Sequence, residues 1–206
     1  MHADHSRRAR GFLSITETEA LIEQGVQVLD PHSALITAHV TLAPGVVIHP
    51  TVILDADAGS RLTVERGSVL YPGCVLEARD RAEILIGAEC ELGPGGVIIR
   101  VGGPSTRLQV GEQVRLTGGC ELTGSCELGR GSQILGAISA RSVRLGAGRG
   151  GHRHPVADER GAVLKGSGIA DQITLDQGQV INCRPSFADA PVERQSAYHP
   201  PAADRA

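Results

Sequence analysis

The residues best suited to chemistry lie in one glycine-rich segment, Gly146-Ala-Gly-Arg-Gly-Gly-His152. Transfer of an acyl group from a thioester to an amine requires a base for the amine proton and close backbone approach to the acyl carrier. We therefore predict that His152 is the general base. We also predict that Gly148, Gly150 and Gly151 form the part of the backbone that lies against a cofactor.

Two other interpretations of this segment stay open. It could be an exposed loop without a chemical role, because the chain also places single histidines in other turn-like segments. Alternatively, His152 and His154 could bind a metal together with His199 or Cys183, because alternate residues of an extended segment point the same way. One His-x-His pair without a nearby carboxylate pattern is weak evidence for such a site, so we predict no metal.

Three arginines, Arg141, Arg144 and Arg149, precede the histidine. A guanidinium binds a phosphate through two parallel hydrogen bonds, so Arg141 and Arg144 are candidate substrate-binding residues. The other interpretation is that these arginines cover strand edges and keep the protein from associating end to end. Both interpretations stay open.

Short strands must position these residues, because single large aliphatic side chains recur every six residues over much of the chain. A helix would place apolar residues at steps of three and four, and a lone strand at steps of two. Steps of six are typical of the hexapeptide repeat of a parallel β-helix, in which three hexads form one triangular coil. The aliphatic positions are Ile36, Leu42, Ile48, Leu54, Val64, Leu70, Leu76, Ile86, Leu92, Ile98, Val110, Leu116, Leu122, Leu128 and Ile134.

A second inward position follows each aliphatic residue by four, and it is filled by small side chains. These are Val40, Val46, Val52, Ala58, Ser68, Cys74, Cys90, Gly96, Val114, Cys120, Cys126 and Ser132. Four of the five cysteines fall in this set and none forms a Cys-x-x-Cys pair, so we interpret these four as small buried residues. The 27 glycines and the absence of tryptophan suit the turns and the narrow core of such a solenoid.

We therefore predict an all-β fold, a left-handed parallel β-helix with a short N-terminal helix and an irregular C-terminal tail. The strict hexads of residues 110–134 favour the left-handed form, although a spacing of about 22 residues in earlier coils also suits a right-handed one. The expected regions are an arm and short helix at 1–25, the β-helix at 26–183 with an insertion at 153–168, and the tail at 184–206.

Composition argues against two classes of partner. The net charge is −3 and only four residues are Phe or Tyr, so neither a basic stripe nor a stacking platform for nucleic acid is expected. No stretch approaches the roughly 20 apolar residues that span a bilayer. We expect a soluble, cytoplasmic protein with no nucleic-acid or membrane partner.

Three segments match a known family: the turn leading into the first coil at 20–31, the Gly-His segment at 143–152, and residues 169–182. They resemble the acetyltransferase half of the bacterial bifunctional N-acetylglucosamine-1-phosphate uridyltransferase/glucosamine-1-phosphate acetyltransferase. The resemblance implies a hexapeptide-repeat acyltransferase that uses acetyl-CoA or another acyl-CoA and assembles as a homotrimer. The implied small-molecule substrate is an amino sugar phosphate or a nucleotide-linked sugar.

The resemblance also assigns roles to residues. His152 matches the family's general base, Arg141 stands where a lysine binds the sugar phosphate, and Asn182 matches a substrate-binding asparagine. The chain departs from the family in several places. Pro155 stands where a tyrosine is expected, an expected arginine has no clear match near Thr117 or Thr123, and neither the uridyltransferase domain nor the last coils are matched. These departures favour the alternative function, a non-catalytic β-helix binding or scaffold protein derived from the same family.

Overall fold

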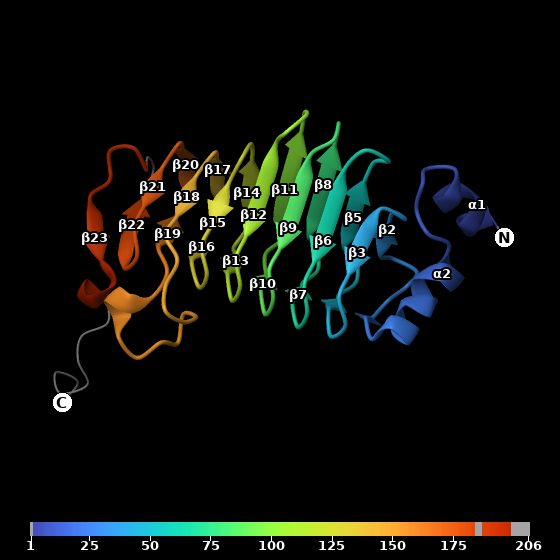
Figure 1. Cartoon of the computed structure of the whole chain (residues 1–206), viewed down its shortest axis with the longest axis horizontal. Helices are drawn as coiled ribbons and strands as arrows, with labels where there is room; N and C mark the ends of the chain where they lie inside the picture. The colour runs from blue at the N-terminus through green and yellow to red at the C-terminus, as the bar shows by residue number, and fades with distance from the viewer. Residues whose placement is uncertain (1, 184–186, 199–206) are drawn as a thin grey trace.

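The computed structural model describes residues 2–183 and 187–198, and it confirms the all-β parallel β-helix (Figure 1). Three sheets form the three faces of a prism, and each successive coil adds one strand to each sheet. We name the faces after their first strands: the β1, β2 and β3 sheets. Every strand pairing is parallel except the last one, between β22 and β23.

The strands are short, as hexapeptide coils require. The β1 sheet contains β1 Gln27–Val28, β4 Val47–Ile48, β7 Val69–Leu70, β10 Glu91–Leu92, β13 Arg115–Thr117, β16 Gln133–Leu135, β19 Val163–Gly166, β22 Gln179–Cys183 and β23 Val192–Arg194. The β2 sheet contains β2 Leu35–Ile36, β5 Ile53–Ala56, β8 Val75–Arg79, β11 Val97–Gly102, β14 Cys120–Thr123, β17 Ile138–Arg141 and β20 Gly168–Asp171. The β3 sheet contains β3 Val40–Leu42, β6 Arg61–Val64, β9 Glu83–Ile86, β12 Arg107–Val110, β15 Glu127–Leu128, β18 Arg144–Leu145 and β21 Thr174–Leu175.

The hexads identify most of the core correctly. Leu116, Leu122 and Leu128 are at most 1% exposed, which confirms their place in the inward ladders. Ile98 is an exception: Ile99 aligns with Leu76 and Leu122 in the core. The turn of residues 93–96, between Leu92 and β11, is one residue longer than the hexad allows, so the side chains of β11 change face.

Four other expected inward positions are not fully buried. Ala58 is exposed in the corner loop after β5, because that loop leaves the coil for several residues. Val40 and Leu42 are half-buried because β3 is the edge strand of its sheet. Gly96 is half-buried within the long turn before β11.

The N-terminal region closes one end of the prism. It contains α1 His2–Arg8, α2 Ile15–Glu19 and the 3₁₀-helix η1 Ala20–Gln24. Ser14 and Glu17 form the capping box that their spacing predicted, with reciprocal hydrogen bonds at the start of α2. The expected polar arm is more than a solvated arm, because Arg7 is only 7% exposed. Its guanidinium donates hydrogen bonds to four backbone carbonyls and one hydroxyl, including the carbonyls of Leu13 at 2.8 Å and Ala34 at 2.6 Å.

The irregular segment lies earlier than the sequence indicated. The structure places it at residues 146–162, between β18 and β19, whereas the prediction was 153–168. The difference arises because Leu164 already aligns with Ile134 in the core ladder, so β19 is a regular strand. The 3₁₀-helix η2 Ala157–Glu159 lies inside the segment.

Part of the expected tail is also ordered. β23 pairs antiparallel with β22, and the 3₁₀-helix η3 Gln195–Ala197 follows it. An antiparallel bridge between Phe12 and Thr37 lies at the opposite end of the prism. Within the described residues, no helix has the length and apolar character that crossing a membrane requires.

Candidate active site

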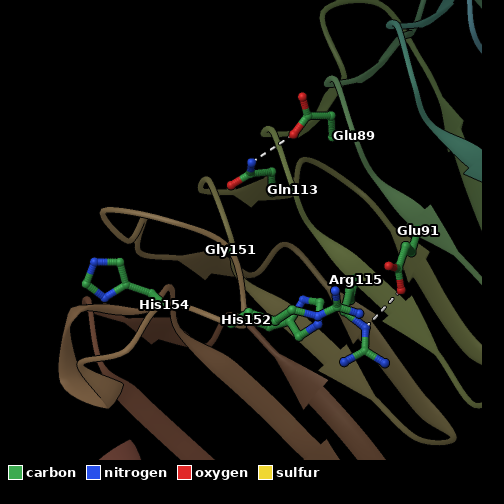
Figure 2. A pocket seen from close by; sticks show the side chains of 8 residues that line it. Glu89, Glu91, Gln113, Arg115, Gly151, His152 and His154 are labelled. Carbon is green, nitrogen blue, oxygen red and sulfur yellow. Dashed lines mark hydrogen bonds and ion pairs between the residues drawn. The ribbon is translucent and has the colours of Figure 1, made fainter.

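Three cavities follow one another along the outer face of the β1 sheet. The first, of about 320 Å³, is lined by Glu89, Glu91 and Gln113 among others, and we call it the carboxylate cavity (Figure 2). The second, of about 240 Å³, is the central cavity, and it shares Arg115 and His152 with the first. The third, of about 340 Å³, is the distal cavity, and it shares Leu135 and Lys165 with the second. The shared residues make the three cavities one groove.

The floor of the groove is a column of outward-facing residues held in register by the parallel ladder. Glu91 of β10 aligns with Arg115 of β13, which aligns with Gln133 of β16, which aligns with Val163 of β19. Outward positions are normally exposed, yet Gln133 is 7% exposed and Val163 only 5%. Residues 146–162 and η3 are hydrogen-bonded to each other, and they supply Arg160 and Gln195 to the lining of the central cavity, so the floor becomes a recess.

His152 stands at the junction of the carboxylate and central cavities. Its pKa is lowered from the ordinary value of 6.5, first by partial burial and second by the positive charge of Arg115, while Glu91 acts in the opposite direction. No hydrogen bond to the His152 ring is made by any residue that the structure describes. The imidazole is therefore held towards its neutral form with a nitrogen lone pair available, which is the state that a general base requires.

Arg115 lines both of these cavities, which makes it a candidate site residue that the sequence did not single out. Its Nε lies 3.1 Å from Oε2 of Glu91, and its Nη1 donates to Oε1 of Gln133 at 3.4 Å. An arginine was expected near Thr117 or Thr123, and Arg115 lies two residues before Thr117 on the same strand, β13. The available signal was its position one residue before the inward Leu116, which turns its side chain outward.

The predicted anion-binding arginines do not gather at this groove. Arg141 lies on the β2 sheet, where its guanidinium donates to both carboxylate oxygens of Asp171, at 2.8 and 2.6 Å. Arg144 lies on the β3 sheet, with its Nε 3.3 Å from Glu127. Within one copy of the chain, both therefore lie on other faces of the prism, and their roles in substrate binding stay predictions. Asn182, by contrast, lines the distal cavity.

Of the three glycines predicted to lie against a cofactor, one lines the groove. Gly151 lines the carboxylate cavity beside His152. Gly148 packs inside the segment itself, since a Cβ there would lie 2.2 Å from the backbone nitrogen of Gly161. Gly150 forms a parallel bridge with Arg160. A glycine is therefore needed at position 148 because the loop that carries His152 packs closely there against the backbone of Gly161.

The structure does not bring together a metal site at His152 and His154. The two rings point in opposite directions (Figure 2), because residues 151–153 form a bend and turn rather than an extended strand. Nδ1 of His154 lies 3.2 Å from the carbonyl of Val156, and its Nε2 lies 3.8 Å from Glu159. No group of three His, Cys, Asp or Glu side chains that could hold a metal occurs in the described part of the chain. Cys183 is buried, and His199 lies outside the described residues.

Comparison with known proteins identifies one related group, although no family model matches the chain. The bifunctional protein GlmU of Desulfitobacterium hafniense, from strain DSM 10664 / DCB-2 and from strain Y51, is 31% identical over 144 residues. The chain is a partial homologue of GlmU. The match covers 62% of this chain and 29% of GlmU, so the chain spans less than a third of the relatives' length. This match confirms the resemblance found in the sequence.

Solved structures also match the chain, although loosely. Among them is a mutant of perosamine N-acetyltransferase from Caulobacter crescentus in complex with CoA and GDP-perosamine. The likeness covers 86% of this chain and 74% of that one, at 15% identity and a TM-score of 0.23. A structural likeness with that TM-score says nothing about the groove. The GlmU match rests on sequence, and it supports a common origin of the coils.

Proposed function

We propose that the protein transfers an acyl group from acetyl-CoA or another acyl-CoA to the amine of an amino sugar that is phosphorylated or nucleotide-linked. The observation that carries the proposal is a single histidine, His152, held towards its neutral form at the junction of two cavities beside a guanidinium. The partial homology with GlmU supports the choice of acyl transfer.

In the proposed reaction, the amine nitrogen attacks the thioester carbonyl while His152 accepts the amine proton. The carbonyl oxygen gains negative charge in the tetrahedral intermediate, and the Arg115 guanidinium supplies the compensating positive charge. The C–S bond then breaks, and the imidazolium of His152 returns its proton to the departing thiolate. The products are the amide and free CoA, and His152 ends in its starting state.

We also propose that the protein works as a homotrimer. One outward row of the β2 sheet is apolar over four consecutive strands, and it consists of Leu35, Ile53, Val75 and Ile98, all half-buried in a single copy. Apolar side chains aligned on a sheet face favour burial against another surface. A neighbouring copy on this row would bury these four side chains.

A second candidate function is a non-catalytic binding or scaffold protein derived from the same origin. The observation that favours it is the lack of a carboxylate partner for His152 among the described residues, since catalytic histidines are commonly oriented by a third group. The groove would then bind a sugar ligand without turnover.

Thiol release from acetyl-CoA, measured with glucosamine 1-phosphate and related amino sugars, tests the proposal. Replacement of His152 by Ala is expected to lower kcat by about 10²- to 10⁴-fold, because that is the usual contribution of a general base. The matched control is His49→Ala, which removes a histidine of the same sheet that stacks on Tyr71 outside the groove, and it should keep wild-type turnover. Full activity in His152→Ala would refute His152 as the base, whereas a wild type that binds the sugar without turnover would establish the scaffold.

A further inference from the structure

We infer, on the basis of the proposed function, that the two ends of the groove take different substrates. The acyl-donor arm lies in the central and distal cavities, where Lys165 and Tyr198 bind it. The acceptor sugar lies in the carboxylate cavity. His152 and Arg115, which line both the carboxylate and the central cavity, then meet the amine from one side and the thioester from the other.

The chemistry of the walls separates the two ends. The carboxylate cavity presents Glu89, Glu91 and Gln113, whose oxygens accept hydrogen bonds from hydroxyl and ammonium groups. Gln113 Nε2 donates to Glu89 at 2.8 Å, so these two side chains already form a polar pair (Figure 2). The central cavity instead has Leu135 and Val163 among its lining residues and suits the alkyl and amide groups of a pantetheine arm.

Lys165 is the only lysine of the chain, and it lies where the central and distal cavities join. Its Nζ is 5.6 Å from the centroid of the Tyr198 ring, and the Tyr198 hydroxyl donates to the Glu193 carboxylate. The ammonium can donate hydrogen bonds to the amide carbonyls of the arm, while the ring offers a flat apolar surface. Asn182, farther along the distal cavity, adds a second amide-binding side chain.

The wall that contains Tyr198 is fixed by hydrogen bonds to the segment that carries His152. Gln195 is buried, and its Nε2 donates to the carbonyl of Gly161 at 2.6 Å. The backbone nitrogen and the hydroxyl of Ser196 donate to the Asp158 carboxylate at 3.0 and 2.9 Å. These bonds connect β23 and η3 to residues 146–162, so the donor end of the groove is built by the C-terminal segment of this chain.

The unique lysine provides a test that does not depend on turnover. An amine-reactive ester should acetylate Lys165 and the N-terminal amine, and peptide mass spectrometry reports each separately. CoA, and pantetheine at higher concentration, are expected to protect Lys165 and to leave the N-terminal amine reactive. Glucosamine 1-phosphate should give no protection. Protection by the sugar alone, or by neither ligand, would overturn the inference.

Variants test the same assignment through kinetics. Lys165→Met and Tyr198→Ala are expected to raise the KM for acetyl-CoA by about 3- to 10-fold each, equivalent to roughly 0.7–1.4 kcal/mol, and to leave the KM for the sugar unchanged. Glu89→Gln should instead raise the KM for the sugar and leave the KM for acetyl-CoA unchanged. The control is Arg107→Gln, which removes an exposed ion pair with Glu83 on the β3 sheet and should change neither KM.

The outcomes separate the inference from the proposed function. Protection of Lys165 by CoA without any turnover would refute acyl transfer while supporting the donor assignment. Turnover with an unchanged donor KM in both Lys165→Met and Tyr198→Ala would support acyl transfer and refute the donor assignment.

Discussion

Gly131 lies in the neighbouring coil against the loop that carries His152, and we predict that Gly131→Ala lowers the proposed activity without touching a substrate. Gly131 precedes β16 with φ +69°, and a Cβ there would lie 2.3 Å from the carbonyl oxygen of Gly150. That contact must open to at least 3.0 Å, so the backbone that leads to His152 has to move by about 0.7 Å. A misplacement of about 1 Å can cost about 10²-fold in rate, so we expect kcat/KM to fall by about 10- to 10²-fold.

The matched control is Gly45→Ala. Gly45 also has a positive φ, +81°, but its added Cβ would make an ordinary 3.5 Å contact with Gly67, and neither glycine lines the carboxylate cavity. Both variants carry the strain of an alanine in the left-handed region, about 1–2 kcal/mol, which chemical denaturation measures. Steady-state kinetics should then separate them, because only Gly131→Ala displaces the loop. Equal kcat/KM in the two variants would refute a role for the position of this loop.

Three further predictions concern charge, packing and assembly. Arg115→Gln removes a cation that lowers the pKa of His152, so this pKa should rise. The acidic limb of the pH profile of kcat/KM should then move to higher pH. An unmoved limb would mean that His152 is not the titrating base. Leu122→Ala deletes a fully buried ladder residue and should lower the free energy of unfolding by about 2–5 kcal/mol in denaturant titrations, whereas a change under 1 kcal/mol would contradict its place in the core. Light scattering should give three times the chain mass of 21.5 kDa, and Val75→Asp should reduce it to one; a wild-type monomer at micromolar concentration would exclude the homotrimer.

The core could be predicted because the inward positions of a β-helix obey one spacing rule. Leu116 and Leu122 are six residues apart and occupy adjacent faces, and their ladders continue in the coils before and after. The rule fails where a turn changes length, as before Ile98, because one extra residue reverses the faces of the following strand. Nothing in the local sequence of residues 93–96 marks the extra residue apart from its cluster of glycines and one proline.

The site could be predicted only in part. The glycine-rich segment pointed to His152 because acyl transfer requires a base and close backbone approach, and because residues 143–152 resemble the Gly-His segment of the acyltransferase family. Outward positions obey no spacing rule. The only signal for Arg115 was therefore its place one residue before the inward Leu116, which turns its side chain outward. Arg141 and Arg144 are close in sequence, yet a corner of the prism separates them. Tyr198 follows a segment without repeats, and only folding brings it to Lys165.

The two antiparallel pairings at the ends of the prism have a consequence for polymerisation. A stack of parallel strands is a template that identical chains could extend, as amyloid fibrils do. At one end β23 reverses the strand direction on the β1 sheet, and at the other Phe12 does so on the β2 sheet. A second copy stacked on one end would therefore meet β23 on the β1 sheet, and a copy stacked on the other end would meet Phe12 on the β2 sheet. In neither case could the parallel ladders of all three sheets continue in register. Growth along the axis stops at the coils of a single chain, which leaves the sides of the prism as the surfaces for association.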